Sequence, residues 1–447
     1  MHGCRVSAGR GSLAADRPGA AADRRRCALH ASCAGVARGR AALRRDRRIP
    51  ARRAGAKMSD ELELLVLGGG AAGFAAAGAF RAAGGGGAVG IVTDELRMPY
   101  RRPPLTKELL RGEATEEQLP LAQESWLVQQ DVRLISGRAV GLDSEARTVD
   151  LSGGRRLRYA DCVLATGAEP IRLPVRGADD PAVRVLRTVA DVRELLRRLG
   201  GGDQVIVIGS GFIGCEIASS LRTRGHPVTL VSDEQAPNIA RLGGEPAAQL
   251  LGWLEQDGIR LCLGASVDAI ERDGETLEVL AGGSGHRARH VIMAVGVAPR
   301  GELATALGIE LKGGAVPVDP AMRTVCPGLL AAGDVCLAEN AAAGRRLRVE
   351  HWGDALGQGE VAGASAAGAE VAWADVPGFW STIGRRTLKY AAWGDGFQEM
   401  RLELHGAGGF TAWYGSGGSI VGVLAHLADE DYERGRELIA AGAPWDR

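Results

Sequence analysis

Short apolar runs followed by alanine-rich segments recur along the chain. Residues 64–67 (Leu-Leu-Val-Leu) predict a buried strand, and residues 71–83 predict a helix that packs closely on it. Residues 204–208 (Gln-Val-Ile-Val-Ile) and 212–224 repeat this order, and Gly225 predicts the end of the second helix. The repeated strand–helix order predicts two parallel α/β sheets.

Each strand–helix junction carries the pattern Gly-x-Gly-x-x-Gly. The first glycine permits a tight turn, the second lets the backbone approach a pyrophosphate, and the third allows close helix packing. Glycine makes up 66 of 447 residues, so chance matches are expected and context decides. A third match, at residues 85–90, precedes a strand and is rejected. The two fingerprints consist of Gly68, Gly70 and Gly73, and of Gly209, Gly211 and Gly214.

Two dinucleotide sites in one chain predict a flavin and a nicotinamide coenzyme, FAD with NADH or NADPH. Asp94 follows the next predicted strand, at residues 90–93, and suits a carboxylate that accepts hydrogen bonds from a ribose. In the second site Ser232 stands where an acid would favour NADH, and Asp233 and Glu234 follow it. No arginine lies within residues 232–234 to bind the 2′-phosphate of NADPH, although Arg241 is near in the sequence. The pattern therefore favours NADH.

Charge separates the first 57 residues from the rest. They hold 15 Lys and Arg against 3 Asp and Glu, which leaves 39 against 51 for residues 58–447. We expect residues 1–57 to be a disordered basic extension from an over-extended start, with Met58 as the natural start; a transit peptide and a nucleic-acid-binding tail are the alternatives. The acidic remainder argues against a nucleic-acid partner, and no apolar stretch is long enough to predict a membrane span.

The eight cysteines form no C-x-x-C or C-x-x-x-x-C pair, and the helix after Gly73 carries none. We therefore expect no redox disulfide, and we expect Cys215 to pack as a small apolar residue. No His/Cys cluster has metal-ligand spacing, so no metal site is predicted. This cysteine usage fits a reducing cytoplasm.

Residues 94–107, Asp-Glu-Leu-Arg-Met-Pro-Tyr-Arg-Arg-Pro-Pro-Leu-Thr-Lys, resemble the corresponding stretch of ferredoxin reductase-like and apoptosis-inducing-factor-like flavoproteins. Residues 165–170, 209–216, 294–299, 331–335 and 349–352 match in order. The resemblance covers residues 63 to about 400. The chain is thus identified as a member of the FAD-dependent pyridine nucleotide-disulfide oxidoreductase superfamily, which includes glutathione reductase, in its branch without a redox disulfide.

The resemblance implies roles for single residues. Arg102 and Lys107 would lie at the FAD pyrophosphate and isoalloxazine, and a solvated basic loop is the alternative. Asp334 would hold the ribityl hydroxyls, where a lone Gly-Asp would be only a turn. Glu216 would pair with Lys107 beneath the flavin, or merely suit its helix N-terminus, and Trp352 would lie against the flavin edge or in the core. The remaining cofactor-binding candidates are Val140, Ala165, Thr166, Gly167, Gly296 and Gly333.

The resemblance and the residue pattern together predict an α/β fold with two interleaved doubly wound Rossmann-like domains and a small C-terminal α+β domain. The FAD-binding domain would comprise residues 58–175 and 299–372. The NAD(P)-binding domain would be inserted at residues 176–298, and the C-terminal interface domain would span residues 373–447.

These features predict an FAD-dependent NAD(P)H oxidoreductase in which Lys107 and Glu216 set the charge near the flavin and a ferredoxin-type protein accepts electrons. Two departures from the family pattern bear on this prediction. Residues 382–384 (Thr-Ile-Gly) follow Trp-Ser, whereas relatives commonly carry Asp-Gln there, so the identity of the electron acceptor stays open. Glu169 stands where relatives often carry an arginine near the FAD. The alternatives are an NADH dehydrogenase or oxidase that uses quinone or oxygen, an apoptosis-inducing-factor-like redox sensor, and a vestigial flavin site. The chain would be a monomer or a homodimer.

Overall fold

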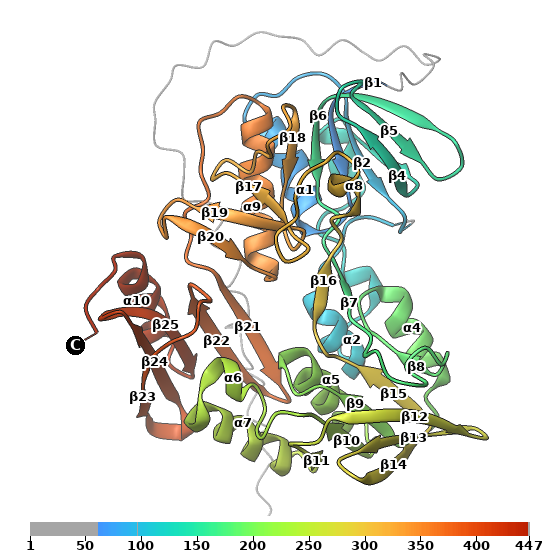
Figure 1. Cartoon of the computed structure of the whole chain (residues 1–447), viewed down its shortest axis with the longest axis vertical. Helices are drawn as coiled ribbons and strands as arrows, with labels where there is room; N and C mark the ends of the chain where they lie inside the picture. The colour runs from blue at the N-terminus through green and yellow to red at the C-terminus, as the bar shows by residue number, and fades with distance from the viewer. Residues whose placement is uncertain (1–60, 96, 446–447) are drawn as a thin grey trace, which may run out of the picture. The chain divides into compact units, whose positions relative to one another are not determined.

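A computed structural model describes residues 61–95 and 97–445 of the chain (Figure 1). Its first large sheet has the strand order β3-β2-β1-β6-β5-β4, and β18 also pairs with β6. The ladders of β1, β2, β3, β6 and β18 are parallel, whereas β4 and β5 add an antiparallel edge. The strands are β1 (Glu61–Leu67), β2 (Val89–Thr93), β3 (Val132–Ser136), β4 (Ala139–Asp143), β5 (Thr148–Leu151), β6 (Arg156–Leu164) and β18 (Leu329–Ala331).

Two helices with small side chains pack against each other beside this sheet. Helix α1 (Ala71–Ala82) follows β1, and α9 (Trp352–Ala366) packs against it. A Cβ atom at Gly359 would lie 2.3 Å from the carbonyl oxygen of Ala72, and one at Gly363 would lie 2.0 Å from that of Ala76. Glycine at both positions therefore lets the two helix backbones touch.

The second sheet is parallel throughout, with the strand order β11-β10-β9-β15-β8. Its strands are β8 (Val183–Arg184), β9 (Val205–Ile208), β10 (Val228–Val231), β11 (Arg260–Cys262) and β15 (His290–Met293). Its helices are α4 (Val189–Arg198), α5 (Phe212–Thr223), α6 (Ile239–Leu242) and α7 (Gly244–Gln256). A separate antiparallel sheet contains β12 (Val267–Asp273), β13 (Thr276–Ala281) and β14 (Ser284–Ala288).

The chain leaves the first sheet and returns to it through paired segments. Strand β7 (Ala168–Pro170) runs antiparallel to β16 (Val297–Pro299), so the outgoing and returning segments lie side by side. After the return, β17 (Val316–Val318), β19 (Cys336–Asn340) and β20 (Arg345–Arg348) form a small sheet. The short helices α2 (Glu108–Arg111), α3 (Ser125–Gln129) and α8 (Glu302–Thr305) lie in connections.

The last sheet is antiparallel, with the order β21-β22-β25-β24-β23, and helix α10 packs on it. Its strands β22, β24 and β25 share one apolar core with α5 and α7, through residues such as Leu221, Trp253 and Phe410. The C-terminal sheet is thus packed directly on the helices of the second sheet. The elements are β21 (Gly378–Ile383), β22 (Arg386–Ala392), β23 (Glu399–Leu404), β24 (Phe410–Ser416), β25 (Ser419–His426) and α10 (Asp429–Ala440).

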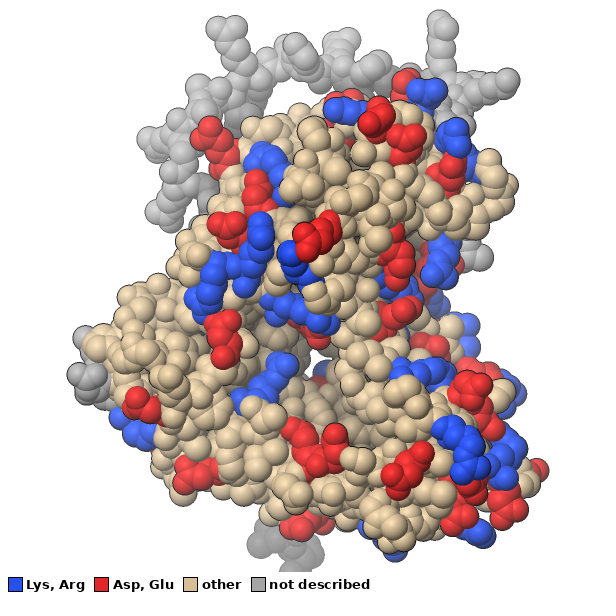
Figure 2. Space-filling model, in the orientation of Figure 1, with Lys and Arg blue, Asp and Glu red and all other residues tan. Residues whose placement is uncertain are grey.

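Acidic and basic side chains are interspersed over most of the face in Figure 2, but Lys and Arg gather over β19 and β20. Strand β20 exposes Arg345, Arg346 and Arg348 and buries Leu347 between them. A basic cluster therefore occurs on a chain whose residues 58–447 carry an excess of acids.

The predicted fold class is confirmed: both fingerprint strands lie inside parallel sheets with flanking helices, and a small α+β unit follows. Gly90 lies within β2, which agrees with rejecting the third glycine match. The domain boundaries stay predictions, and the expectations for residues 1–57 lie outside the described residues. No described helix is both long and apolar enough to cross a membrane. Within residues 61–95 and 97–445, no group of His, Cys, Asp and Glu could hold a metal ion.

Candidate functional site

The first glycine fingerprint leaves an open space where its helix begins. Gly68 has a φ of +127°, and a Cβ there would lie 2.1 Å from the carbonyl oxygen of Ala165. A Cβ at Gly73 would lie 2.0 Å from the carbonyl oxygen of Gly68, whereas one at Gly70 would meet no atom within 4 Å. No side chain caps α1. The free amides and the open side suit a pyrophosphate.

The second fingerprint repeats this geometry at α5. Gly209 has a φ of +105°, and a Cβ there would lie 2.4 Å from the carbonyl oxygen of Ala294. A Cβ at Gly214 would lie 2.0 Å from the carbonyl oxygen of Gly209, whereas one at Gly211 would meet no atom within 4 Å. No side chain caps α5. The same steric requirements at both junctions fit two bound dinucleotides.

Two loops complete the first site. The hydroxyl of Thr166 donates to the carbonyl oxygen of Arg300 at 2.7 Å, and the Arg300 N–H donates to that of Gly167 at 2.9 Å. Gly333 has a φ of +82°, and a Cβ there would lie 3.0 Å from Cβ of Ala72 in α1. The structure therefore brings the predicted residues of both loops to the first fingerprint.

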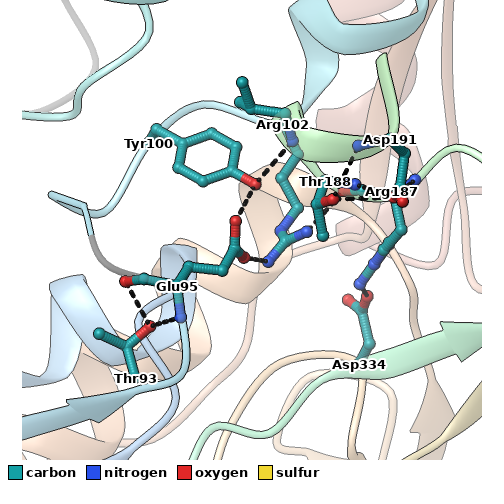
Figure 3. Close-up of polar contacts among 9 residues, drawn as sticks. Thr93, Glu95, Tyr100, Arg102, Arg187, Thr188, Asp191 and Asp334 are labelled. Carbon is teal, nitrogen blue, oxygen red and sulfur yellow. Dashed lines mark hydrogen bonds and ion pairs between the residues drawn. The ribbon is translucent and has the colours of Figure 1, made fainter. Parts of the chain in front are cut away.

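Asp334 forms an ion pair with Arg187, which lies just before α4 (Figure 3). Their Nη2 and Oδ2 atoms are 2.8 Å apart, with 28% and 13% of the side chains exposed. Arg187 also lies near the loop of Thr166 and Gly167, because its Nη2 lies 3.7 Å from where a Cβ of Gly167 would be. The sequence analysis missed Arg187, which lies outside the matching stretches. With Asp334, it is a candidate for holding the sugar and phosphate parts of FAD.

Arg102 connects this ion pair to the end of β2. It donates through Nη1 to the carbonyl oxygen of Arg187 at 2.6 Å and through Nη2 to Glu95 at 2.9 Å (Figure 3). The hydroxyl of Tyr100 donates to Glu95 at 2.6 Å, and burial raises the pKa of this tyrosine well above its usual value. Asp94, the predicted ribose acceptor, is exposed, and its neighbour Glu95 is half-buried and accepts from Tyr100 and Arg102.

The second site contains two adjacent acids, Asp233 and Glu234, that differ in exposure. Asp233 is exposed, whereas Glu234 accepts hydrogen bonds from the Ser210 hydroxyl at 3.0 Å and from the Asn238 N–H at 3.2 Å. Ser210 lies between the first two glycines of the fingerprint, and its hydroxyl is 2.8 Å from that of Ser232. Glu234 is thus held against the dinucleotide-binding turn.

Lys107 and Glu216 form the buried ion pair expected from the resemblance. Lys107 Nζ lies 2.8 Å from Glu216 Oε2, and only 5% and 3% of these side chains are exposed. Thr106 donates to the same oxygen at 2.6 Å, and Ser381 of β21 donates to Oε1 at 2.7 Å. Glu216 therefore accepts hydrogen bonds from the segment before α2 and from the C-terminal sheet. Neither Thr106 nor Ser381 was predicted, although both lie in stretches that the sequence analysis discussed.

Three further predicted residues lie in three separate places. Val140 is 60% exposed on β4, which begins shortly after Ser136, the partner of Thr93 at the end of β2. Trp352 is half-buried at the start of α9. Gly296 has a φ of +106° and lies just before β16. The predicted functions of the site residues stay predictions.

The cysteines of the described residues are all free. Burial raises the pKa values of Cys162 and Cys215 far above the usual range and that of Cys336 to about 12. A thiol that stays protonated is a poor nucleophile. These three buried cysteines are therefore unsuited to disulfide exchange.

Residues 62–359 match the family model described as pyridine nucleotide-disulphide oxidoreductase. The chain belongs to this family. It is 33% identical over 333 residues to rubredoxin-NAD(+) reductase of Pseudomonas putida, a match that covers 73% of the chain and 86% of the relative. It is 28% identical over 394 residues to human apoptosis-inducing factor 3, which covers 86% of the chain but only 64% of that protein.

Among solved structures, a ferredoxin reductase from Rhodopseudomonas palustris superposes with a TM-score of 0.82 at 30% identity, covering 86% of the chain and 96% of that structure. This family uses FAD and NAD(H), and its members are oxidoreductases. The two open glycine junctions accommodate these two groups. Residues of the first junction, with Arg187 and Asp334, would hold FAD, and Ser210 and Glu234 would lie at the nicotinamide coenzyme.

Proposed function

We propose that this enzyme oxidises NADH with FAD as its cofactor and passes the electrons singly to a ferredoxin-type iron–sulfur protein. When bound, FAD accepts a hydride and releases electrons one at a time. The buried pair of Lys107 and Glu216 carries the proposal, because it joins the segments that follow the two dinucleotide sites. Thr106 and Ser381 both donate to Glu216, so this carboxylate is held in place before the reaction begins.

NADH is the proposed coenzyme because of Glu234. A carboxylate held at the fingerprint turn accepts hydrogen bonds from ribose hydroxyls and repels a 2′-phosphate. Ser210 and Asn238 hold the Glu234 carboxylate in place, so its discrimination between NADH and NADPH does not depend on the flexibility of its own side chain.

An iron–sulfur acceptor is supported by the relatives named for rubredoxin and ferredoxin. The exposed arginines of β20, of which Arg345 and Arg348 also pair with Asp395 and Glu350, give an acidic carrier a region with basic groups. The free cysteines support a reducing compartment, which we propose is the cytoplasm.

The test is anaerobic stopped-flow reduction of the purified FAD-loaded chain by NADH and by NADPH at equal concentrations. We expect rapid flavin bleaching with NADH, slower bleaching with NADPH, and subsequent reduction of an added ferredoxin. Slow reduction by both coenzymes, with a long-lived charge-transfer complex and a change in molecular size, would instead support a redox sensor. Rapid reduction followed by transfer only to quinone or oxygen would overturn the proposed acceptor.

A further inference from the structure

A pocket of about 420 Å³ lies away from both glycine fingerprints and has a basic lining. It is bounded by the end of α2, the end of α5 and the glycine-rich loop after α4. None of its lining residues belongs to the proposed coenzyme sites. They are Arg111, Leu199, Gly200, Gly201, Arg224 and His226.

Arg111 is buried in this lining with unused hydrogen-bonding capacity. Only 7% of its side chain is exposed; Nε lies 2.9 Å from Glu113, and Nη2 lies 3.6 Å from Glu108. Its Nη1 atom is buried and has no hydrogen-bond partner among the described residues. A buried guanidinium nitrogen without an acceptor is costly, and an anion in the pocket would satisfy it.

Arg224 brings a second positive charge to the same end of α2. Its Nη1 would lie 2.9 Å from a Cβ of Gly112, the residue that ends this helix, and it donates to the carbonyl oxygen of Leu110 at 3.4 Å. This long bond uses one of the five guanidinium donors. Arginine groups at one pocket provide the fork geometry that binds phosphate oxygens.

His226 adds a third basic group to the lining. Its Nδ1 lies 3.1 Å from the carbonyl oxygen of Asp203, so Nδ1 donates in that bond. Nε2 is then the remaining ring nitrogen, and His226 is buried in the lining. The carboxylates near the lining are Glu108 and Glu113, both beside Arg111, and Asp203, which accepts from the Gly200 N–H at 2.8 Å.

The elements that line the pocket also carry, or contact, the Lys107–Glu216 pair. The backbone N–H of Arg111 donates to the carbonyl oxygen of Lys107 at 2.8 Å. Glu216 lies in α5, and Arg224 directly follows the last residue of that helix. The Ser220 hydroxyl donates to the carbonyl oxygen of Thr106 at 2.7 Å, which joins α5 to the segment that carries Lys107.

We propose that this pocket binds a small anion bearing a phosphate group, and that its occupancy favours the arrangement of Lys107 and Glu216. The ligand would draw the ends of α2 and α5 together by bridging Arg111 and Arg224. The pocket volume has room for more than a single phosphate ion, so a free phosphate and a phosphorylated metabolite share the required chemistry. The second half of the proposal rests on the proposed role of the Lys107–Glu216 pair.

The first experiment is calorimetric titration of the FAD-loaded chain with inorganic phosphate and with glucose 6-phosphate, at saturating NAD⁺ so that the nicotinamide site is filled. We expect one saturable site in the wild type and at least about tenfold weaker binding in Arg224→Gln. Arg224 is exposed, so this variant should fold. Arg434→Gln removes an equally exposed charge from α10 and should bind like the wild type.

Tighter binding of glucose 6-phosphate would identify a phosphorylated metabolite as the natural class, whereas equal or weaker binding would identify free phosphate. Absence of saturable binding, or equal affinity in Arg224→Gln and wild type, would overturn the site. The second measurement is flavin reduction by NADH, which phosphate should accelerate in the wild type and not in Arg224→Gln. Binding without a rate change would overturn the coupling alone. Failure of NADH to reduce any of these chains would count against the proposed function, since the titration measures the site independently.

Discussion

At the scale of single residues, the site depends on carboxylates that the fold buries or holds. Glu216 is 97% buried as a side chain and accepts from three different residues. Glu95 and Glu234 are each held by neighbouring donors, while the adjacent Asp94 and Asp233 are exposed. The strand pattern predicted the turns after β2 and β10 to within a residue or two. It does not indicate which of the two adjacent acids at each turn is held by neighbouring donors, because that depends on the three-dimensional structure.

Replacing Lys107 by Met should leave the buried Glu216 carboxylate without its counter-charge. Removing one partner of a buried ion pair costs about 3–5 kcal/mol. We expect a loss of that order in the free energy of unfolding, measured by urea denaturation of the FAD-loaded chain, together with slower flavin reduction by NADH. The double variant Lys107→Met, Glu216→Gln should recover much of the stability, because it buries no unpaired charge, but not the rate. A Lys107→Met chain as stable as the wild type would contradict this account.

Glu234→Gln should weaken the preference for NADH. The amide keeps the size of the side chain and removes the charge that would repel a 2′-phosphate. We expect the ratio of kcat/KM for NADPH to that for NADH to rise by about tenfold, equivalent to about 1.4 kcal/mol. Asp233→Asn is the matched control, because it removes an exposed charge one residue away. If both variants shift the ratio equally, general charge and not the held carboxylate sets the preference.

At the scale of elements, the contact between α1 and α9 positions the first site. Helix α1 begins at the first fingerprint, and Gln358 of α9 accepts from the Gly333 N–H at 2.9 Å beside Asp334. Alanine-rich patterning predicted α1 and its close packing on β1. Its second partner, α9, lies nearly 300 residues further along the chain, and local periodicity holds no information on such a contact.

Gly363→Ala should separate these two helices. The new methyl group would lie 2.0 Å from the carbonyl oxygen of Ala76, so a backbone has to move, at a cost of about 1–3 kcal/mol or more. We expect a lower thermal midpoint and faster loss of FAD. Gly357→Ala, in the same helix, would meet its nearest neighbour only at 3.8 Å and should be neutral or stabilising by up to about 1 kcal/mol. Similar destabilisation of both variants would show that helix packing is not the cause.

At the scale of the whole molecule, the segment before α2, helix α5 and the C-terminal sheet meet at one carboxylate, that of Glu216. The resemblance predicted the pairing of Lys107 with Glu216 but not its link to Ser381, because the partners lie 165 positions apart. The Trp-Ser pair was noted only for the departure that follows it, at residues 382–384. In the structure that serine donates to Glu216 from the C-terminal sheet, next to the residues that depart from the family pattern.

Ser381→Ala tests whether the C-terminal sheet acts on the chemistry or only on stability. Loss of the donor would leave Glu216 Oε1 unsatisfied in a buried position, which costs about 1–3 kcal/mol of unfolding free energy. If Ser381 positions Glu216, the rate of flavin reduction should fall several-fold while the KM for NADH stays the same, because no coenzyme contact is removed. Thr382→Ala is the control: it removes a hydroxyl from the same strand, one whose partner is Thr387 of β22. If Ser381→Ala loses stability but reduces its flavin at the wild-type rate, Ser381 has a structural role only. The C-terminal sheet would then have no effect on the charge of the Lys107–Glu216 pair during flavin reduction.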